Sequence, residues 1–367
     1  MSVTRRELLT AVSAALTSAP GRQGRHYVYD FAGTPFEIGL QHGKALSREI
    51  RAEAQPAAEA MARKWGTTVE TAVARTLSRY EALYREHVPA ALEEIRGIAQ
   101  GAGLSYAYSF FAAARDMMRT GECTALVCTG KQARGGQVLI GQTKDTGSGL
   151  DRFRIMRLAY RSGRRLIVLN YPGWIGNLCL TSDGLSFTGN SLFASSPNSP
   201  TVPGSLLKRL IMEKRSTREV LDAIQGMSFE NGCLLVADRS GQAVCLEMAA
   251  GRTEAREVSG EAFGHANDIL LPALKGFESV RRSASSPLRQ KNIDRLLREH
   301  AGRITVPSLE RMLRDHTDFP LSICRHPSER DSGTTNAAFI ADLTAGQMHI
   351  AIGNPCVAPF KRYDLSF

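Results

Sequence analysis

Cys123 stands where the sequence changes from a helical to a strand pattern, in the run Gly121-Glu122-Cys123-Thr124. A cysteine at the first residue of a strand is accessible from its N-terminal side, and its thiolate can attack a carbonyl carbon. If the Glu122–Cys123 peptide bond is cleaved, Cys123 also carries an α-amino group. The pKa of an α-amino group lies near ~7.7–8.0 and that of a free thiol near ~8.5, so the amine can accept the thiol proton. One residue would then supply both the nucleophile and the base.

Taken alone, a cysteine that opens a strand is more often an inert core residue than a nucleophile. The chain has seven cysteines, an odd number at wide spacings, which argues against a disulfide framework and indicates at least one free thiol. No Cys-x-x-Cys pair occurs, and no His or Asp completes a site around Cys123 and Cys128, so we expect no metal and no cofactor. The cysteines are Cys123, Cys128, Cys179, Cys233, Cys245, Cys324 and Cys356.

Signatures of other chemistries are missing from the sequence. Asp331-Ser332-Gly333 superficially resembles the nucleophile triplet of serine proteases, but no Gly-x-Ser-x-Gly elbow accompanies it. Dinucleotide-binding, P-loop and zinc-protease motifs do not occur either. His265 and His326 are candidate bases, although a histidine that flanks a strand is more often a hydrogen-bonded structural residue.

The elements that must position Cys123 follow from the periodicity of the sequence. Alternating residues at 26–31 predict a strand, and apolar residues at i, i+3 and i+4 spacing predict helices from 36 to about 115. From Cys123 onward the pattern becomes that of short strands separated by glycine or polar turns. The β-prone runs are 123–128, 137–142, 153–160, 166–170, 185–188, 234–237 and 243–247.

Helices return in the second half of the chain and are followed by closing strands. The segment 204–226 is predicted to be helical, with a Ser216-x-x-Glu219 capping box inside it and Gly226 as its stop. A helical block, many antiparallel strands, two more helices and closing strands suit a layered α+β sandwich. The remaining helices are expected at 287–300 and 307–315, and the closing strands at 336–343 and 348–352.

Composition restricts the class of function. The 367-residue chain is 43 % hydrophobic and 22 % charged, which is ordinary for a globular enzyme, and no run of 18 or more apolar residues could span a membrane. The net charge of +10 comes mostly from scattered arginines, without a nucleic-acid-binding module. We therefore expect no nucleic acid and no membrane as a partner. A basic surface suits an anionic substrate, although solubility explains it as well.

The first residues resemble a twin-arginine export signal, because Arg5 and Arg6 precede a mildly apolar stretch of small residues at 10–20. The alternative is a frayed helix at the start of a cytoplasmic protein, since the apolar stretch is short and has no clear cleavage site. We slightly favour export and leave residues 1–24 out of the expected fold.

Five short motifs occur in the same order as in a known enzyme family. Cys123-Thr-Ala-Leu-Val-Cys128, followed by Gly141-Gln142-Thr-Lys-Asp145, resembles the start of the mature β chain in the acyl-coenzyme A:6-aminopenicillanic acid acyltransferase family. This family of cysteine nucleophiles also contains β-alanyl-amine hydrolases. The resemblance extends over about residues 26–360. Its other motifs are Gly33-x-Pro-x-Glu37-x-Gly39-x-Gln-His42-Gly43, Gly264-His265-Ala-Asn267, Ser322-Ile-Cys-Arg325-His326 and Gly353-Asn-Pro-Cys356.

The resemblance implies a four-layer αββα sandwich of the N-terminal-nucleophile hydrolase type, together with roles for several residues. Cys123 would be the nucleophile in self-cleavage and in turnover, and Asp145 would orient the N-terminal region and assist processing. Asn267 would donate its side-chain amide to the oxyanion, and one such donor is typically worth ~3–4 kcal/mol of barrier. The residues assigned to substrate binding are Arg325, Ser332 and His265.

Glu122 departs from the family pattern, because the type member has glycine before its nucleophile. Glycine eases the strained backbone that an N-to-S acyl shift needs, so Glu122 could slow processing. Two alternatives therefore stay open. One is an unprocessed homologue that binds a ligand without catalysis, and the other is an unprocessed amidase that uses Cys123 with a histidine base.

The sequence thus predicts a precursor that cleaves itself between Glu122 and Cys123. Its α chain would be 1–122, with a helical part at 25–122, and its β chain 123–367, forming one catalytic domain. The expected reaction is hydrolysis of a small N-acyl amine or N-acyl amino acid through an acyl-Cys123 intermediate, since water is the default acceptor. Acyl transfer from a coenzyme A thioester to an amine is the alternative. The expected partners are the small amide or thioester substrate and the two chains of the precursor.

Overall fold

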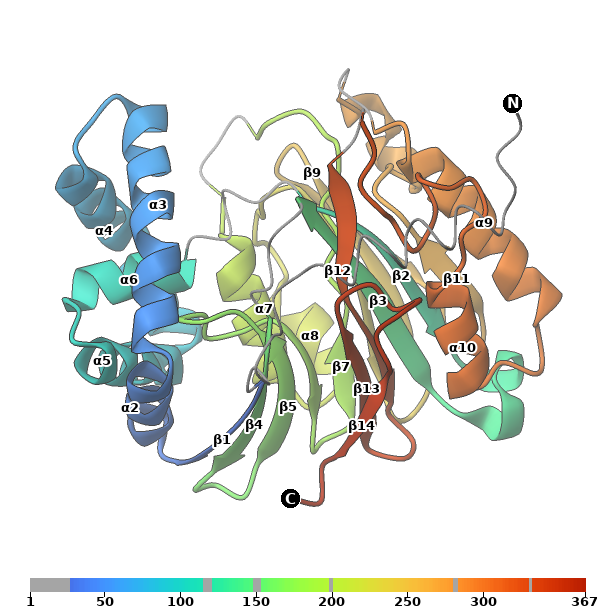
Figure 1. Cartoon of the computed structure of the whole chain (residues 1–367), viewed down its shortest axis with the longest axis horizontal. Coiled ribbons are helices and arrows are strands. Elements are labelled where there is room, and N and C mark those ends of the chain that lie inside the picture. The colour runs from blue at the N-terminus through green and yellow to red at the C-terminus, as the bar shows by residue number, and fades with distance from the viewer. Residues whose placement is uncertain (1–26, 115–120, 148–152, 198–200, 280–282, 330–331) are drawn as a thin grey trace, which may run out of the picture.

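Two β-sheets lie face to face between two helical layers in this computed structural model (Figure 1). The structure describes residues 27–114, 121–147, 153–197, 201–279, 283–329 and 332–367. The predicted export signal at 1–24 lies outside the described residues. None of the described helices has both the length and the apolar character needed to cross a membrane.

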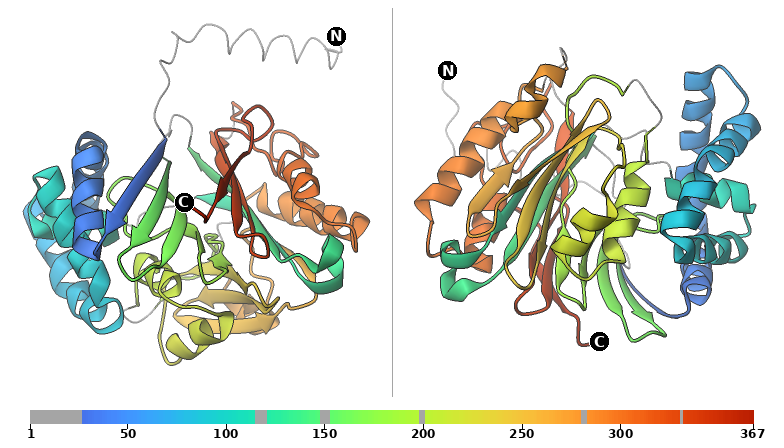
Figure 2. Two further views of the ribbon diagram at one scale, coloured as in Figure 1. Left: turned by 90° about the horizontal axis from the view of Figure 1, so that it is seen from below. Right: turned by 180° about the vertical axis from the view of Figure 1, so that it is seen from behind.

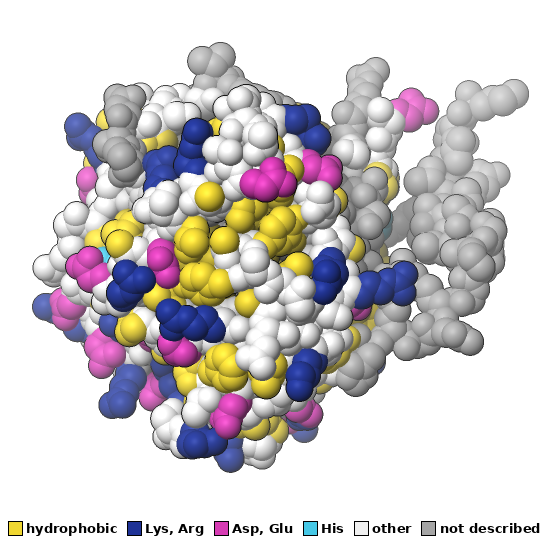
Figure 3. All heavy atoms as spheres, turned by 90° about the vertical axis from the view of Figure 1, so that its left-hand side faces the viewer, with side chains coloured by type: hydrophobic (Ala, Val, Ile, Leu, Met, Phe, Trp, Pro, Cys, Tyr) yellow, Lys and Arg dark blue, Asp and Glu magenta, His cyan; other side chains and the backbone are white. Residues whose placement is uncertain are grey.

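The helical block predicted for 36–115 covers the outer face of the larger sheet. Its first helix begins at a capping box, in which the Thr34 hydroxyl accepts from the Glu37 amide and the Glu37 carboxylate accepts from the Thr34 amide. On the outer face of the block, charged side chains of both signs surround a patch of hydrophobic side chains (Figure 3). The helices are α2 (Pro35–Ala45), α3 (Ser47–Trp65), α4 (Val69–His87), α5 (Pro89–Ala102) and α6 (Tyr106–Ala114).

Helices α2 and α5 pack backbone against backbone, because glycines meet at their crossing. A Cβ on either Gly39 or Gly97 would lie within 2.1 Å of a carbonyl oxygen of the other helix. On the same helix as Gly39, the buried His42 ring accepts a hydrogen bond from the Gly173 amide at 3.0 Å. Burial lowers the pKa of His42 to about 4, so its ring is neutral and can accept. The first family motif thus serves helix packing.

The larger sheet has eight strands in the order β1-β4-β5-β6-β7-β8-β9-β10. Its neighbours are antiparallel except β1 and β4, which pair in parallel. The pairing of β1 with β4 ties the beginning of the chain to a strand that follows Cys123. The strands are β1 (Val28–Gly33), β4 (Arg154–Tyr160), β5 (Arg165–Asn170), β6 (Leu178–Thr181), β7 (Leu185–Phe187), β8 (Gly232–Asp238), β9 (Ala243–Ala249) and β10 (Arg252–Glu257).

The smaller sheet has six antiparallel strands in the order β11-β2-β3-β12-β13-β14. Strand β2 begins at Glu122 and lies between β11 and β3, but β11 ends opposite Ala125, so Cys123 pairs with a strand on the β3 side only. The strands are β2 (Glu122–Cys128), β3 (Leu139–Gly147), β11 (Ala262–His265), β12 (Gly333–Asp342), β13 (Gln347–Ile352) and β14 (Lys361–Asp364).

Apolar cores join the four layers. Along β2, Ala125 and Val127 pack between the two sheets, while Leu126 and Cys128 pack beneath the helices of the opposite face. Those helices are α9 (Ser286–Glu299) and α10 (Val306–Leu313), and α7 (Gly204–Met212) and α8 (Thr217–Ala223) join the helical block on the larger sheet (Figure 2). The predicted four-layer αββα sandwich is therefore confirmed.

Two features differ from the prediction. The segment 204–226 forms two helices, because the Ser216 hydroxyl accepts from the Glu219 amide and caps a new helix there. The capping box is incomplete, since the Glu219 carboxylate accepts from the Arg215 amide instead of the Ser216 amide. The prediction also omitted four strands: β6, β10, β11 and β14.

Candidate active site

Cys123 lies near the start of β2 and, by the alternation of that strand, faces the larger sheet. Its directly opposed neighbour on β3 is Lys144, so the two side chains share a face, with Cβ atoms roughly 4.5–5.5 Å apart. The Lys144 ammonium donates a hydrogen bond to the Gly189 carbonyl at 3.1 Å. Only 2 % of Cys123 is exposed, so its thiol is buried in the intact chain.

Asn267 holds the backbone of Cys123 at the point where the neighbouring strand has ended. Strand β11 pairs with β2 as far as His265 opposite Ala125, and the Asn267 side chain continues this edge. Its Oδ1 accepts from the Cys123 amide at 3.0 Å, and its Nδ2 donates to the Ser191 carbonyl at 2.8 Å. Asn267 is fully buried, so these contacts are shielded from water.

Arg289 on α9 connects the groups around the Glu122–Cys123 bond. Its Nη1 donates to the Cys123 carbonyl oxygen at 2.6 Å and to Thr124 Oγ1 at 3.0 Å. Its Nη2 donates to Glu122 Oε2 at 2.5 Å and to Asn267 Oδ1 at 2.8 Å. The planar guanidinium has enough donors in fixed directions for all four contacts. This fully buried residue lies outside the sequence motifs and was not predicted from them.

Glu122 is anchored by four donors on its carboxylate. Ser283 and Ser285 donate at 2.7 and 2.6 Å, and the guanidinium groups of Arg289 and Arg325 lie at 2.5 and 3.0 Å. Burial raises the pKa of Glu122, but the two arginines and the two hydroxyls outweigh it and lower the pKa below its ordinary value. The ionised side chain therefore fixes the N-terminal side of the bond to Cys123.

Asp145 lies directly opposite Glu122 across strands β2 and β3. It is buried, its Oδ1 accepts from the Thr335 hydroxyl at 2.7 Å, and its Oδ2 has no hydrogen-bond partner among the described residues. Burial raises the pKa of Asp145, and the charges of Arg289 and Arg325 oppose that shift. A buried carboxyl with a raised pKa can hold and release a proton beside the bond.

The structure brings Arg325 into this cluster and places His265 elsewhere. The His265 ring is fully buried, with Nε2 at 2.7 Å from a Glu247 carboxylate oxygen and Nδ1 at 2.9 Å from the Ala266 carbonyl. Both ring nitrogens are engaged with protein groups in the intact chain, and a substrate contact of His265 stays a prediction. Ser332 is exposed, immediately before β12.

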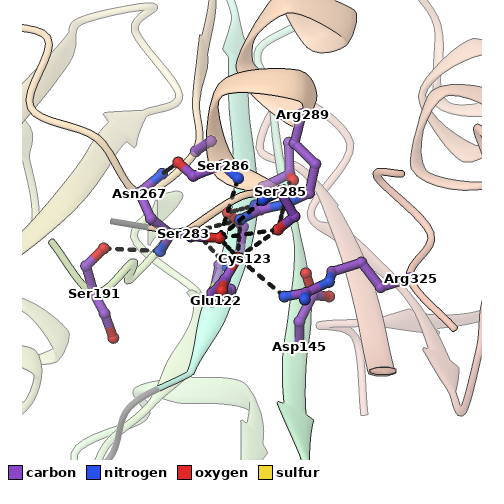
Figure 4. Close-up of polar contacts among 12 residues, drawn as sticks. Glu122, Cys123, Asp145, Ser191, Asn267, Ser283, Ser285, Ser286, Arg289 and Arg325 are labelled. Atoms are coloured by element: carbon purple, nitrogen blue, oxygen red, sulfur yellow. Dashed lines mark hydrogen bonds and ion pairs between the residues drawn. The ribbon is translucent and has the colours of Figure 1, made fainter. Parts of the chain in front are cut away.

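Figure 4 shows how these groups surround the start of β2, with Asn267 and Ser191 on one side and Asp145 and Arg325 on the other. The arrangement contains a thiol, a fixed amide nitrogen, a cation bonded to a carbonyl oxygen and a buried carboxyl. These are the parts that nucleophilic cleavage of an amide requires. Four further residues of the site were not predicted from the sequence: Lys144, Ser283, Ser285 and Arg289.

The sequence matches one protein-family model, described as acyl-coenzyme A:6-aminopenicillanic acid acyl-transferase, over residues 133–356. The chain is 25 % identical over 335 residues to the 40 kDa form of acyl-coenzyme A:6-aminopenicillanic-acid-acyltransferase from Emericella nidulans. That alignment covers 88 % of this chain and 91 % of the relative.

Two solved structures are similar at low sequence identity. A mutant form of conjugated bile acid hydrolase from Clostridium perfringens aligns with a TM-score of 0.44 and 9 % identity, over 66 % of this chain and 96 % of that chain. Penicillin V acylase from Agrobacterium tumefaciens aligns with a TM-score of 0.45 and 11 % identity, over 66 % of this chain and 86 % of that chain.

Proposed function

Since the chain belongs to the acyl-coenzyme A:6-aminopenicillanic acid acyl-transferase family, and so is a C–N hydrolase or acyltransferase, we propose that Cys123 is its nucleophile. The chain would first cleave its own Glu122–Cys123 bond and then hydrolyse a small N-acyl amine or N-acyl amino acid. One observation carries this proposal. The Cys123 amide donates to Asn267 Oδ1 at 3.0 Å, and Arg289 donates to the Cys123 carbonyl oxygen at 2.6 Å.

Self-cleavage begins with attack of Cys123 Sγ on the Glu122 carbonyl carbon. The C–N bond then breaks, which leaves a thioester on sulfur and a free amine on Cys123. Water hydrolyses the thioester and releases the new Glu122 carboxylate and the thiol. The thiol gives up a proton as it attacks, and the departing nitrogen takes one up. Asp145 can supply the proton to the nitrogen and be reprotonated by the one that the thiol releases, because burial raises the pKa of its carboxyl and it lies opposite Glu122.

Asn267 would keep its position after cleavage. The oxygen that accepts from the Cys123 amide can also accept from the new α-amine, which fixes that amine beside the thiol. With a pKa near ~7.7–8.0, part of the amine is neutral and takes the thiol proton. One Nδ2 hydrogen of Asn267 bonds the Ser191 carbonyl, and the other would donate to the oxyanion of the substrate.

Arg325 would determine which substrates the processed enzyme prefers. In the intact chain its guanidinium pairs with Glu122 at 3.0 Å, so that carboxylate shields it. Once Glu122 becomes the end of a separate chain and moves away, Arg325 loses this partner. A substrate that carries a carboxylate, such as an N-acyl amino acid, would then replace it. Ser332, exposed before β12, remains a further proposed contact.

Acyl transfer to an amine is the second candidate function. The 25 % identical relative from Emericella nidulans is named as an acyl-coenzyme A acyltransferase. In this version the acyl-Cys123 thioester is attacked by an amine instead of water, and the same side chains are used.

Intact-mass measurement of the purified chain tests the first step. Cleavage gives fragments of roughly 13 and 27 kDa, the shares of the 40.0 kDa chain before and after residue 122. Cys123→Ala should remain a single chain, without turnover of N-acyl substrates and without an acyl adduct. A single chain from the unmodified sequence that is still alkylated at Cys123 and active would indicate an unprocessed amidase. Amide turnover by Cys123→Ala would overturn both versions.

A further inference from the structure

Two histidines and two cysteines converge at a place outside the site described above. They come from the loop after α10, which carries His316, Cys324 and His326, and from the turn after β13, which carries Cys356. One nitrogen or sulfur atom of each residue lies within 4.8 Å of all the others. This is a Cys₂His₂ set, assembled from parts of the chain that are far apart in sequence.

The spacing of these atoms matches a tetrahedral metal site. His326 Nε2 lies 3.0 Å from His316 Nε2, 3.7 Å from Cys324 Sγ and 3.4 Å from Cys356 Sγ. Zn–S bonds of about 2.3 Å and Zn–N bonds of about 2.0–2.1 Å at tetrahedral angles require ligand atoms roughly 3.3–3.8 Å apart. The side chains would need shifts of only a few tenths of an ångström to share one ion.

We propose that His316, Cys324, His326 and Cys356 bind one zinc ion. Two thiolates and two imidazoles are a ligand set that zinc favours, and four protein ligands leave no open coordination position. The site is therefore structural and does not activate water. Cys324 is buried whereas His316 is exposed, so an ion can enter from the His316 side.

A second group of potential ligands, Cys233, Cys245 and His265, does not have this character. Its histidine already uses both ring nitrogens, on Glu247 and on the Ala266 carbonyl. It therefore offers two thiols without a free imidazole nitrogen. The group serves as a matched control.

The zinc site would act on the candidate active site through one residue. Arg325 lies between the ligands Cys324 and His326, and its backbone carbonyl accepts from the Asn354 side chain at 2.8 Å, two residues before Cys356. An ion that joins the loop to the turn would therefore fix Arg325 against Glu122. This consequence rests on the proposed function, whereas binding of the metal does not.

Metal analysis of the full chain, purified without chelator from zinc-supplemented medium, tests the proposal. We expect about one zinc per chain. His316→Ala and Cys356→Ser should each lose most of it, while Cys233→Ala and Cys123→Ala should keep it. Because Cys123→Ala abolishes the proposed catalysis, the zinc content and the proposed function are tested separately. Replacement of zinc by cobalt should give the thiolate charge-transfer and visible bands of a tetrahedral Cys₂His₂ site.

Three results would overturn the proposal. The first is a chain that holds no zinc and takes none up on titration. The second is a Cys324–Cys356 disulfide in the peptide map of the unreduced chain. The third is full zinc retention in both ligand variants. His316→Ala keeps the test valid if the cysteine variant misfolds, because His316 is exposed and its loss should leave the circular-dichroism spectrum unchanged.

Discussion

Arg289 is the residue on which the geometry of the candidate site depends most. It donates hydrogen bonds to the Cys123 carbonyl, to the Glu122 carboxylate and to the Asn267 oxygen that accepts from the Cys123 amide. We expect Arg289→Lys to keep the positive charge but to lose the planar set of donors that makes these contacts together. Self-cleavage should slow by about 10- to 100-fold, because small displacements of reacting groups are costly. The rate of self-cleavage is measured from the intact mass of the chain as a function of time.

The matched control for this substitution is Arg295→Lys on the same helix, where the arginine pairs with Glu299 near the surface. The Arg295→Lys variant should cleave itself at the rate of the unmodified chain. If Arg289→Lys also processes normally while its melting temperature is unchanged, Arg289 does not position the bond. A lower melting temperature with normal processing would assign it a role in stability alone.

Lys144 is predicted to support turnover by the processed enzyme. Lys144 lies directly opposite Cys123 and its ammonium holds the Gly189 carbonyl at 3.1 Å, so Lys144→Met should slow turnover of N-acyl substrates by about tenfold, because small displacements of reacting groups are costly. The exposed Lys131 provides the control, and Lys131→Met should turn over these substrates like the unmodified chain. Equal rates for all three proteins would remove Lys144 from the mechanism.

The sequence pointed to Cys123, Asn267, Asp145 and Arg325 through short motifs, and the structure brings these four together around Glu122. It could not point to Arg289 or to the two serines that anchor Glu122. They lie more than 160 positions after Glu122 and reach it only because α9 packs on the sheet beside β2. An arginine and serines near the start of a polar helix form no sequence motif that would predict a role in a site.

The helices of the first block were predictable because most of them show apolar residues at helical spacing, whereas the crossing of α2 and α5 depends on glycine. We expect Gly39→Ala to lower the free energy of unfolding by about 1–3 kcal/mol or more, since its Cβ would lie 2.0 Å from the Glu94 carbonyl oxygen. Gly276→Ala, where a Cβ meets nothing within 4 Å, should change it by less than about 0.5 kcal/mol. Urea unfolding compares them, and equal values would contradict a close-packed crossing.

Strands were harder to predict than helices, for identifiable reasons. Strand β10, with the sequence Arg-Thr-Glu-Ala-Arg-Glu, is largely exposed at the sheet edge, so it shows little hydrophobic pattern. Strands β6, β11 and β14 have four residues each, too short for alternation to be visible. These short segments become strands because they pair with neighbouring strands. Which segments lie next to one another is known only once the fold is known.

The two halves of the chain form one body, which matters if the bond before Cys123 is cut. Strand β1 pairs with β4 over six residues, and side chains of α2–α6 share a core with the larger sheet. An α chain that ends at Glu122 would therefore stay bound to the β chain without a covalent link. The arrangement allows a new N-terminus to appear inside a sheet while the fold is kept.

The two sheets are joined at one end by a buried pair, Glu247 on β9 and His265 on β11, and this pair predicts how stability depends on pH. Burial lowers the pKa of His265, but Glu247 outweighs it and raises the pKa above 6.5. Burial raises the pKa of Glu247, but its bond to His265 lowers the pKa below 4.5. The contribution of His265 to the free energy of unfolding is therefore complete below pH 6.5, and it is lost as pH rises through the raised pKa of His265.

Across that range of pH, the free energy of unfolding should fall by up to about 1.4 kcal/mol per pH unit. His265→Gln, which can still donate to Glu247, should show a flatter profile in urea unfolding between pH 6 and 9 than the unmodified chain, and parallel profiles would show that the ring does not titrate with folding.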